Sequence, residues 1–261
     1  MIGRQSENGK FPCVLLHGWG ISSVAWQLIV EPLEQYFDVI QIDLPGFGIN
    51  AHDCPADYTL DELADKIAPI IVEKVPHKAL VVGWSLGGLV ATRLATRYNE
   101  QVAALCLVAS SPCFVEQENW PGIKASVLSS FAQLLRDDSN TTIERFLAIQ
   151  AMGSEHARDD IKWLKKVVLR QQKADMIALQ GGLEILQNTD LRQELAELSI
   201  PVRGIYGRLD SLVPRKTIEP LSELVKDFEY TIVKKASHAP FISHKDEFMQ
   251  LFCGYFEDLI R

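Results

Sequence analysis

Lys78-Ala-Leu-Val-Val-Gly-Trp-Ser85-Leu-Gly-Gly-Leu-Val-Ala-Thr-Arg-Leu-Ala95 is the stretch of the chain that decides its fold. The apolar run before Ser85 predicts a buried strand, and the run after it has the spacing of a helix. The sharp turn between them needs glycine at 83 and 87, because a Cβ at either position would collide with the strand or the helix. This arrangement predicts that the Ser85 hydroxyl stands at the end of a strand, where it can act as a nucleophile.

A serine nucleophile needs a histidine that removes its proton. The chain offers six histidines, which are His17, His52, His77, His156, His238 and His244. His238 is favoured because it follows the short strand that begins at Tyr230, and catalytic groups gather at the carboxyl ends of parallel strands. Ser243 and Asp246 form the pattern of a helix N-cap and capping box, so a surface role is expected for His244. His52 and His77 lie in polar segments close to prolines and are expected to be solvated. His156 lies in a charged segment without the acid–nucleophile context of a triad, so no catalytic role is expected for it.

The histidine in turn needs a carboxylate that fixes its tautomer. Asp210 is the best candidate, because it follows the buried strand Val202-Arg-Gly-Ile-Tyr-Gly207 in the unit just before the one that carries His238. The resulting order along the chain is nucleophile, acid and histidine. This is the order found in α/β-hydrolases, and it differs from the orders of chymotrypsin-like and subtilisin-like enzymes.

Ester chemistry also needs backbone N–H donors for the oxyanion that forms on the carbonyl oxygen. Val14-Leu-Leu-His17-Gly-Trp-Gly20 reads as a strand that ends in such a loop. We expect the donors to be the N–H groups of Trp19 and of Leu86, the residue after the nucleophile. His17 is expected to support this loop by hydrogen bonding and to have no chemical role.

Composition narrows the class of protein. The 261 residues are 47% hydrophobic and 23% charged, which suits one soluble globular domain with an inserted subdomain. A net charge of -8 disfavours nucleic-acid and anionic-membrane partners, and no apolar run approaches the length of a membrane span. The N-terminus lacks the apolar core of a signal peptide, so a cytoplasmic location is expected. Five scattered cysteines indicate free thiols and argue against a disulfide scaffold or a zinc site.

The rest of the chain alternates strands and helices, which predicts a mostly parallel sheet with helices on both faces. We expect a helix at 24–36, a strand at 37–42 ending in the turn Asp43-Leu-Pro-Gly-Phe-Gly48, a capped helix at 58–75 and a strand at 102–110. The first ten residues are too polar and short to supply an opening hairpin. Between Pro112 and Asn188 the strand pattern disappears, and helices are expected at 123–136, 142–152 and 157–172. The predicted α/β-hydrolase core therefore comprises residues 1–111 and 189–261, with a helical cap at 112–188 over the serine.

Several longer motifs occur together and point to a narrower family. They are His17-Gly-Trp-Gly, Asp43-Leu-Pro-Gly-Phe-Gly, Gly83-Trp-Ser-Leu-Gly-Gly-Leu-Val-Ala, Val108-Ala-Ser-Ser-Pro-Cys-Phe, Glu118-Asn-Trp-Pro-Gly-Ile-Lys, Glu144-Arg-Phe-Leu-Ala, Gly181-Gly-Leu-Glu-Ile-Leu, Asp190-Leu-Arg and His238-Ala-Pro-Phe-Ile-Ser-His. With these motifs the chain resembles the pimeloyl-[acyl-carrier protein] methyl ester carboxylesterases of biotin synthesis. The resemblance runs from about Val14 to the C-terminal helix, and the motifs in the cap are its most specific part.

The resemblance implies a pimeloyl methyl ester carried on acyl carrier protein, hydrolysed to pimeloyl-[acyl-carrier protein] and methanol without metal or organic cofactor. It also implies that Trp19, Trp84 and Phe146 line the acyl site, although core packing is the alternative for each. Arg145, Arg158, Lys162 and Lys165 fall at positions that face the carrier in the family. Lys162 and Thr141 stand where the family pattern has arginine, and lysine lacks the planar fork of that side chain. A monomer is expected.

Charge supports an acidic partner, because residues 157–173 carry six basic side chains, Arg170 among them, against two acidic ones. On a helix, residues 158, 162, 165 and 166 share one face, which could steer an acidic carrier protein towards the site. A solvated cap helix explains the same charges equally well.

The triad and the fold are also compatible with other functions. The same triad would serve a broad short-chain carboxylesterase or a carbon–carbon bond hydrolase, and the fold could also belong to a noncatalytic binding protein. A dehalogenase is disfavoured because it needs aspartate at position 85.

Overall fold

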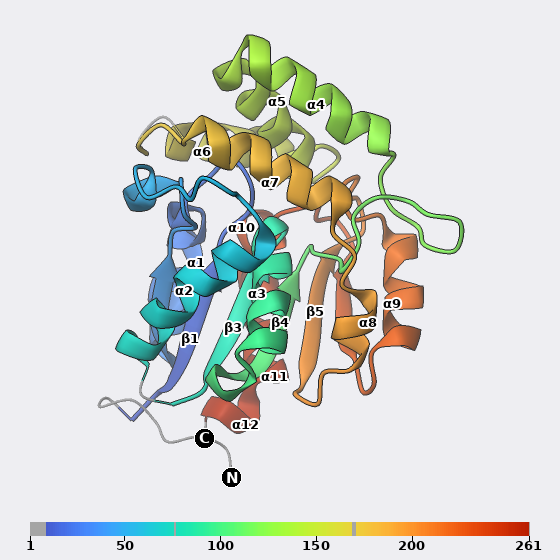
Figure 1. Cartoon of the computed structure of the whole chain (residues 1–261). Coiled ribbons are helices and arrows are strands. Elements are labelled where there is room, and N and C mark those ends of the chain that lie inside the picture. The colour runs from blue at the N-terminus through green and yellow to red at the C-terminus, as the bar shows by residue number, and fades with distance from the viewer. Residues whose placement is uncertain (1–8, 76, 169–170, 261) are drawn as a thin grey trace.

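A single sheet of six parallel strands organises the protein (Figure 1). The structure is a computed structural model that describes residues 9–75, 77–168 and 171–260. The strands are β1 (Phe11–Leu16), β2 (Phe37–Ile42), β3 (Ala79–Trp84), β4 (Val102–Val108), β5 (Val202–Gly207) and β6 (Glu229–Val233). Their order in the sheet is β2-β1-β3-β4-β5-β6, and every pair of neighbours is parallel. The predicted fold class is thereby confirmed.

The central strands are continuous apolar runs because both of their faces are covered. Every residue of β1 and β3 is buried, whereas the edge strand β6 begins with exposed side chains. An alternating pattern would have indicated a sheet with one face in water. Parallel pairing also brings all the carboxyl ends of the strands to one edge of the sheet, and the predicted catalytic loops lie there.

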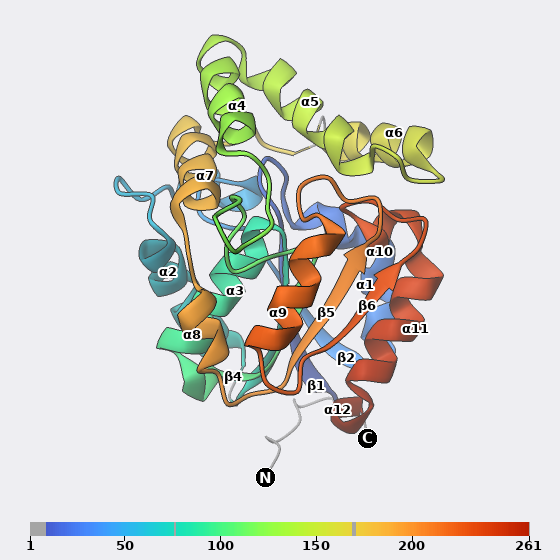
Figure 2. The same ribbon diagram turned by 90° about the vertical axis from the view of Figure 1, so that its right-hand side faces the viewer.

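Helices cover the two faces of the sheet, as Figures 1 and 2 show from directions at right angles. One face is covered by α1 (Gln27–Glu34), α10 (Pro240–Ser243) and α11 (Lys245–Tyr255), with the short α12 (Glu257–Ile260) at the end. The other face is covered by α2 (Leu60–Lys74), α3 (Leu86–Arg97), α8 (Arg192–Ala196) and α9 (Ile218–Leu224). The expected capping of α2 is confirmed, because Thr59 Oγ1 accepts the N–H of Glu62 at 3.2 Å.

Four further helices lie above the carboxyl ends of the strands, coloured from green to golden orange in Figure 1. They are α4 (Ala125–Asp137), α5 (Ser139–Ala151), α6 (Ala157–Val168) and α7 (Met176–Asn188), and we call them the cap helices. α4 packs against both α5 and α7, and α5 packs against α6. The chain thus leaves the sheet after β4, builds these helices, and returns to the sheet at β5.

Some predicted boundaries differ from the observed ones for local reasons. The helix expected at 24–36 begins as a 3-10 turn, Ser23–Trp26, before α1 starts at Gln27. The strand expected at 102–110 ends at Val108, because Ala109 has a positive φ of 44°. The expectation about an N-terminal hairpin falls mainly on residues 1–8, which lie outside the described residues.

Two other expectations concern thiols and membranes. All five cysteines are free thiols, as predicted. Across the described part of the chain, no helix is both long enough and apolar enough to cross a bilayer.

Candidate active site

Ser85 occupies a strained turn between β3 and α3. Its φ is 54°, a backbone conformation that costs a residue with a side chain on the order of 1–3 kcal/mol. A Cβ on Gly83 would lie 2.3 Å from the carbonyl oxygen of Gly87, and one on Gly87 would lie 2.4 Å from the carbonyl oxygen of Leu16. Hydrogen bonds from the Ser85 N–H to Val108 and from Ser110 Oγ to the Ser85 carbonyl fix the turn. The two glycines are therefore required by close approach of the backbone.

Asp210 and His238 form a buried hydrogen-bonded pair. His238 Nδ1 lies 2.8 Å from Asp210 Oδ2, and both side chains are fully buried. The other carboxylate oxygen, Oδ1, accepts the N–H groups of Leu212 and Val213 at 2.8 and 3.0 Å. Because an ionised carboxylate can only accept, Nδ1 carries the proton and Nε2 presents a lone pair. Within the described residues Nε2 is buried without a hydrogen-bond partner, so it is the atom available to take a proton from a nucleophile.

The loop that carries His238 is fastened to the serine turn and to the cap helices. Trp84, the residue before Ser85, donates its indole Nε1–H to the carbonyl of His238 at 2.8 Å. The N–H of His238 donates to the carbonyl of Gln150 in α5 at 3.0 Å. The two hydrogen bonds of the His238 backbone thus connect it to the turn that carries Ser85 and to helix α5.

Two backbone donors are placed beside the serine. Gly18 abuts Ser85, since a Cβ on Gly18 would lie 3.3 Å from the Cβ of Ser85. Leu86 is the first residue of α3, so its N–H has no partner within the helix. Among the described residues no acceptor takes the N–H of Trp19. Both predicted oxyanion donors are therefore without an acceptor among residues 9–75, 77–168 and 171–260.

His17 supports the oxyanion loop from below. Its Nε2 accepts the N–H of Leu44 at 2.9 Å, so the proton must be on Nδ1, which donates to the carbonyl of Gly18 at 2.8 Å. Burial lowers the pKa of His17 below its usual value, against smaller opposing effects of Asp43 and the Gly18 carbonyl. The imidazole is neutral and joins the loops after β1 and β2, in line with the structural role expected for it.

The three aromatic residues expected to line the acyl site have different surroundings. Trp19 contacts the cap helices: its indole donates to the carbonyl of Leu179 in α7 at 2.8 Å, and its ring lies 4.7 Å from that of Phe146 in α5. Trp84 instead packs on the core side of His238, with its ring 5.0 Å from Phe241 and 5.9 Å from the imidazole. Trp19 and Phe146 thus meet at the junction of cap and core, whereas Trp84 is placed to hold His238.

The expected carrier-facing residues lie on the outside of α5 and α6. Arg145, Arg158 and Lys162 are exposed. The inner side of α6 is formed by Asp160, Leu164 and Val167. Lys165 is paired with Glu144 at 2.7 Å, an exposed ion pair that reduces the positive charge it offers to a partner. Arg170, counted in the basic segment, lies outside the described residues.

Sequence reasoning missed Gln150. Its side chain is fully buried, and within the described residues neither its amide nitrogen nor its amide oxygen has a hydrogen-bond partner. Buried polar groups in folded proteins are almost always paired, so an unpaired amide on the residue that accepts the His238 N–H calls for an outside partner. The only signal in the sequence is one glutamine in the otherwise apolar run Phe146-Leu-Ala-Ile-Gln-Ala151.

The assignment of His244 to a helix capped by Ser243 is wrong. α11 begins after His244, which is itself the N-cap residue and caps with no side-chain hydrogen bond. Ser243 ends α10, and its hydroxyl contacts the Ala239 carbonyl and His244 Nδ1 instead. Pro240 starts this separate short helix two residues after His238, which displaces the start of the next helix.

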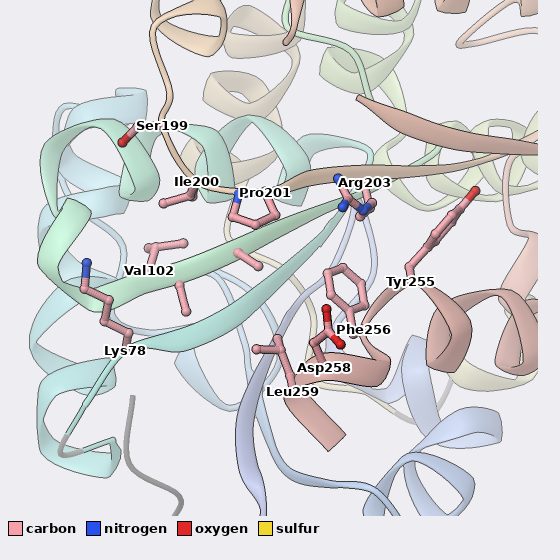
Figure 3. A pocket seen from close by; sticks show the side chains of 12 residues that line it. Lys78, Val102, Ser199, Ile200, Pro201, Arg203, Tyr255, Phe256, Asp258 and Leu259 are labelled. Atoms are coloured by element: carbon pink, nitrogen blue, oxygen red, sulfur yellow. The ribbon is translucent and has the colours of Figure 1, made fainter. Parts of the chain in front are cut away.

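The predicted catalytic residues are closed off from solvent, with exposed fractions of 1% for Ser85 and 0% for His238. A hollow of about 510 Å³ lies elsewhere, among Val102, Pro201, Arg203 and Tyr255 (Figure 3). Val102 and Arg203 belong to the amino-terminal ends of their strands, so this hollow is at the edge of the sheet opposite the serine. It takes no part in the triad.

Comparison with solved structures supports the fold. An esterase from Exiguobacterium antarcticum superimposes with a TM-score of 0.85 over 97% of this chain and 98% of its own, at 20% sequence identity. An enol-lactonase from Burkholderia xenovorans LB400 gives a TM-score of 0.82 over 97% of this chain and 94% of its own, at 18% identity. At such identities the likeness concerns the fold alone.

Comparison of sequences places the chain more narrowly. The family model for the alpha/beta hydrolase fold matches residues 12–245. The pimeloyl-[acyl-carrier protein] methyl ester esterases of Aeromonas hydrophila and Aeromonas salmonicida are each 47% identical to it over 238 residues, which cover 91% of this chain and 92% of theirs. The chain therefore belongs to the α/β-hydrolase family and, within it, to the family of pimeloyl-[acyl-carrier protein] methyl ester esterases.

Proposed function

We propose that this protein is a serine carboxylesterase that hydrolyses the methyl ester of pimeloyl-[acyl-carrier protein], yielding pimeloyl-[acyl-carrier protein] and methanol for biotin synthesis. The observation that carries the proposal is the buried hydrogen bond between Asp210 and His238, whose Nε2 is free beside the serine turn of a chain 47% identical to esterases of that name.

The chemistry begins with attack of Ser85 Oγ on the ester carbonyl carbon while His238 Nε2 takes the hydroxyl proton. Asp210 accepts the Nδ1–H throughout and stabilises the imidazolium. The N–H groups of Trp19 and Leu86 bind the oxyanion, and His238 then protonates the methoxide as methanol leaves. Water enters, gives a proton to the same nitrogen, and attacks the carbonyl carbon of the acyl-serine. The bond between that carbon and Ser85 Oγ then breaks, His238 Nε2 returns the proton to Oγ, and the product leaves as the carboxylic acid, which ionises in solution.

Substrate contacts are proposed for three side chains. Trp19 and Phe146 would contact the acyl chain, because their rings meet where the cap helices lie over the oxyanion loop. The Gln150 amide would hydrogen-bond a polar atom of the substrate, since it is buried beside His238 and unpaired within the described residues. For Trp84 we propose a positioning role through its hydrogen bond to the His238 carbonyl.

The carrier protein would dock on the outer side of α5 and α6. Arg145, Arg158 and Lys162 are the proposed contacts, and Lys165 would contribute less because Glu144 pairs with it. We keep residues 112–188 as the proposed cap domain, with 1–111 and 189–261 as the core. A monomer in the cytoplasm completes the proposal, and the five free thiols suit a reducing compartment.

The test is to follow the mass of pimeloyl-[acyl-carrier protein] methyl ester during incubation with the enzyme, beside p-nitrophenyl butyrate as a small ester. We expect demethylation of the carrier substrate by the wild type and none above background by Ser85→Ala, which should fold normally. If only the small ester reacts, the protein is a general carboxylesterase. If Ser85→Ala retains the wild-type rate, the nucleophile assignment is wrong.

A further inference from the structure

A second cluster of reactive side chains lies where the cap helices meet the core, on residues to which the hydrolytic reaction gives no role. Glu155 and His156 precede α6, and His244 stands between α10 and α11. Figure 2 shows α6 lying over α10 and the upper end of α11. One ligand atom from each of the three residues lies within 4.8 Å of the others. Two imidazoles and a carboxylate from two parts of the chain thus converge on one point.

The hydrogen bonds of His244 prepare it to be a ligand. Ser243 Oγ lies 3.3 Å from the Ala239 carbonyl, to which it donates its single proton. The same oxygen therefore accepts from His244 Nδ1, 2.8 Å away, and the proton of the neutral imidazole is on Nδ1. Nε2 is left with its lone pair, buried and without a partner within the described residues. Metal-binding histidines have this arrangement, with the second nitrogen donating to an oxygen of the protein.

The cap side of the cluster is held in place by its own contacts. The Glu155 N–H donates to the Lys235 carbonyl at 3.2 Å, and its Oε1 pairs with Lys235 Nζ at 2.6 Å, so the second carboxylate oxygen remains for another bond. The His156 N–H donates to Ser154 Oγ at 3.2 Å, and this hydroxyl donates to Asp160 Oδ2 at 2.8 Å. The two imidazole rings are 5.7 Å apart between centroids.

We propose that Glu155, His156 and His244 bind a divalent transition-metal ion of the zinc class. Two imidazole nitrogens and one carboxylate oxygen suit zinc, whereas magnesium and calcium prefer oxygen ligands alone. Bonds of about 2.0–2.2 Å bring tetrahedral ligands to about 3.4 Å from one another, so small rotations of the exposed Glu155 and His156 side chains close the site. Water completes the coordination.

The charges around the site fit a cation. Glu155 supplies one negative charge, which Lys235 already shares. Asp160 interacts electrostatically with both histidines and adds negative potential, although burial raises the pKa of its carboxyl group. The ion would link the loop before α6 to the start of α11, and so tie the cap helices to the core. Because such an ion binds the folded chain through residues far apart in sequence, it should stabilise the fold.

The test is calorimetric titration of the full-length protein with zinc chloride at about pH 7.5, where free imidazole is mostly neutral. The thiols are kept reduced with a non-chelating phosphine. We expect one ion per chain. His156→Gln and His244→Gln should each lower the zinc affinity by at least about tenfold, because even the loss of a residue that only hydrogen-bonds a metal ligand lowers affinity by about 10–100-fold. The matched control is His52→Gln, which changes an exposed histidine that is not part of the cluster and should bind zinc as the wild type does.

A second measurement guards against variants that fold poorly. Saturating zinc should raise the melting temperature of the wild type and of His52→Gln by about 3–6 °C, and magnesium should not. The double variant His156→Gln/His244→Gln should melt at the same temperature with and without zinc. Two results would overturn the proposal. One is an undiminished zinc affinity in the double variant. The other is a cobalt–thiolate charge-transfer band as the only sign of binding when Co²⁺ replaces zinc in the wild type, because that band would show that cysteines bind the ion.

Discussion

The backbone and the side chain of Gln150 have different hydrogen-bonding surroundings. Its backbone carbonyl accepts the N–H of His238, and its side-chain amide is buried with neither atom paired among the described residues. An unpaired buried amide destabilises the fold, typically by about 1–3 kcal/mol. A residue that costs stability at this position is best explained by a bond that forms only when substrate is present.

The change Gln150→Leu separates these effects. Leucine keeps the backbone carbonyl and removes the unpaired polar atoms, so we expect the free energy of unfolding to rise by about 1 kcal/mol while kcat/KM falls by about tenfold. Urea denaturation and steady-state kinetics measure the two quantities. Gln133→Leu, on the exposed side of the neighbouring helix α4, is the control and should change neither. Unchanged turnover in Gln150→Leu would leave that side chain with a packing role only.

His17 predicts a dependence of stability on pH. Burial lowers its folded-state pKa below the value of about 6.5 expected in the unfolded chain. At pH values between these two pKa values, the unfolded state binds more protons than the folded state. The contribution of His17 to the free energy of unfolding is therefore complete above the pKa that it has in the unfolded chain. It is lost as the pH falls towards the pKa that it has in the folded protein. We therefore expect the wild type to lose more stability between about pH 7.5 and about pH 5 than His17→Gln loses.

Denaturant midpoints at the two pH values give this difference. His52→Gln is the comparison, because it makes the same substitution at an exposed histidine. Identical losses in wild type and His17→Gln would mean that other groups dominate acid destabilisation.

At the scale of elements, helix α7 joins the cap to the core through a pair of glycines. A Cβ on Gly182 would lie 2.6 Å from Cδ1 of Trp19, and one on Gly181 would lie 2.5 Å from the Cβ of Tyr58. The helix therefore approaches the oxyanion loop more closely than any residue with a side chain allows. Two glycines lower the helix propensity of α7, but they allow its backbone to contact Trp19 and Tyr58.

Gly182→Ala should destabilise the protein by about 1–3 kcal/mol, because the methyl group displaces Trp19 in a packed interior. It should also lower kcat, since Trp19 carries a proposed oxyanion donor. The matched control is Gly254→Ala in α11, where nothing lies within 4 Å of the new Cβ. There the same change should stabilise by up to about 1 kcal/mol through helix propensity alone. Thermal melts and ester kinetics of both variants decide the point, and equal effects would show that the contact with Trp19 is unimportant.

The elements also show what could be predicted from the sequence. Long apolar runs identify the buried strands, and the glycines around Ser85 identify the turn, because both signals are local. Gln150 escaped prediction, since one glutamine in a helix looks like an exposed position until the fold buries it. The predicted start of α11 is wrong because Ser243 is the last residue of the short helix α10, and His244 is the N-cap of α11. Glu155, His156 and His244 could not be grouped, because only the tertiary fold brings them together.

For the whole molecule, the distribution of charge matters more than its sum. The chain carries a net charge of -8, yet the outer sides of α5 and α6 present Arg145, Arg158 and Lys162. An acidic carrier would be repelled by most of the surface and attracted to this part of it. Orientation and encounter rate would follow from that asymmetry.

Arg145→Glu/Arg158→Glu should therefore lower kcat/KM for the carrier-linked ester by about tenfold at low salt and leave a small ester within about twofold. The difference should shrink as salt screens the charges. The control Lys74→Glu/Lys226→Glu makes the same change in net charge near the amino-terminal ends of the strands, away from the cap helices. Equal losses on both esters, or equal effects of the two double variants, would contradict docking on the cap.

Trp19 links the proposed oxyanion hole to the cap helices. Its N–H is a proposed oxyanion donor, and its indole is held by the Leu179 carbonyl of α7 and packed against Phe146 of α5. Moving the cap helices aside would therefore also displace this proposed oxyanion donor. An open molecule would then be a weak catalyst as well as an accessible one. Such a coupling would favour substrates that keep the cap helices closed over Trp19, and it would lower the rate for esters that enter without doing so.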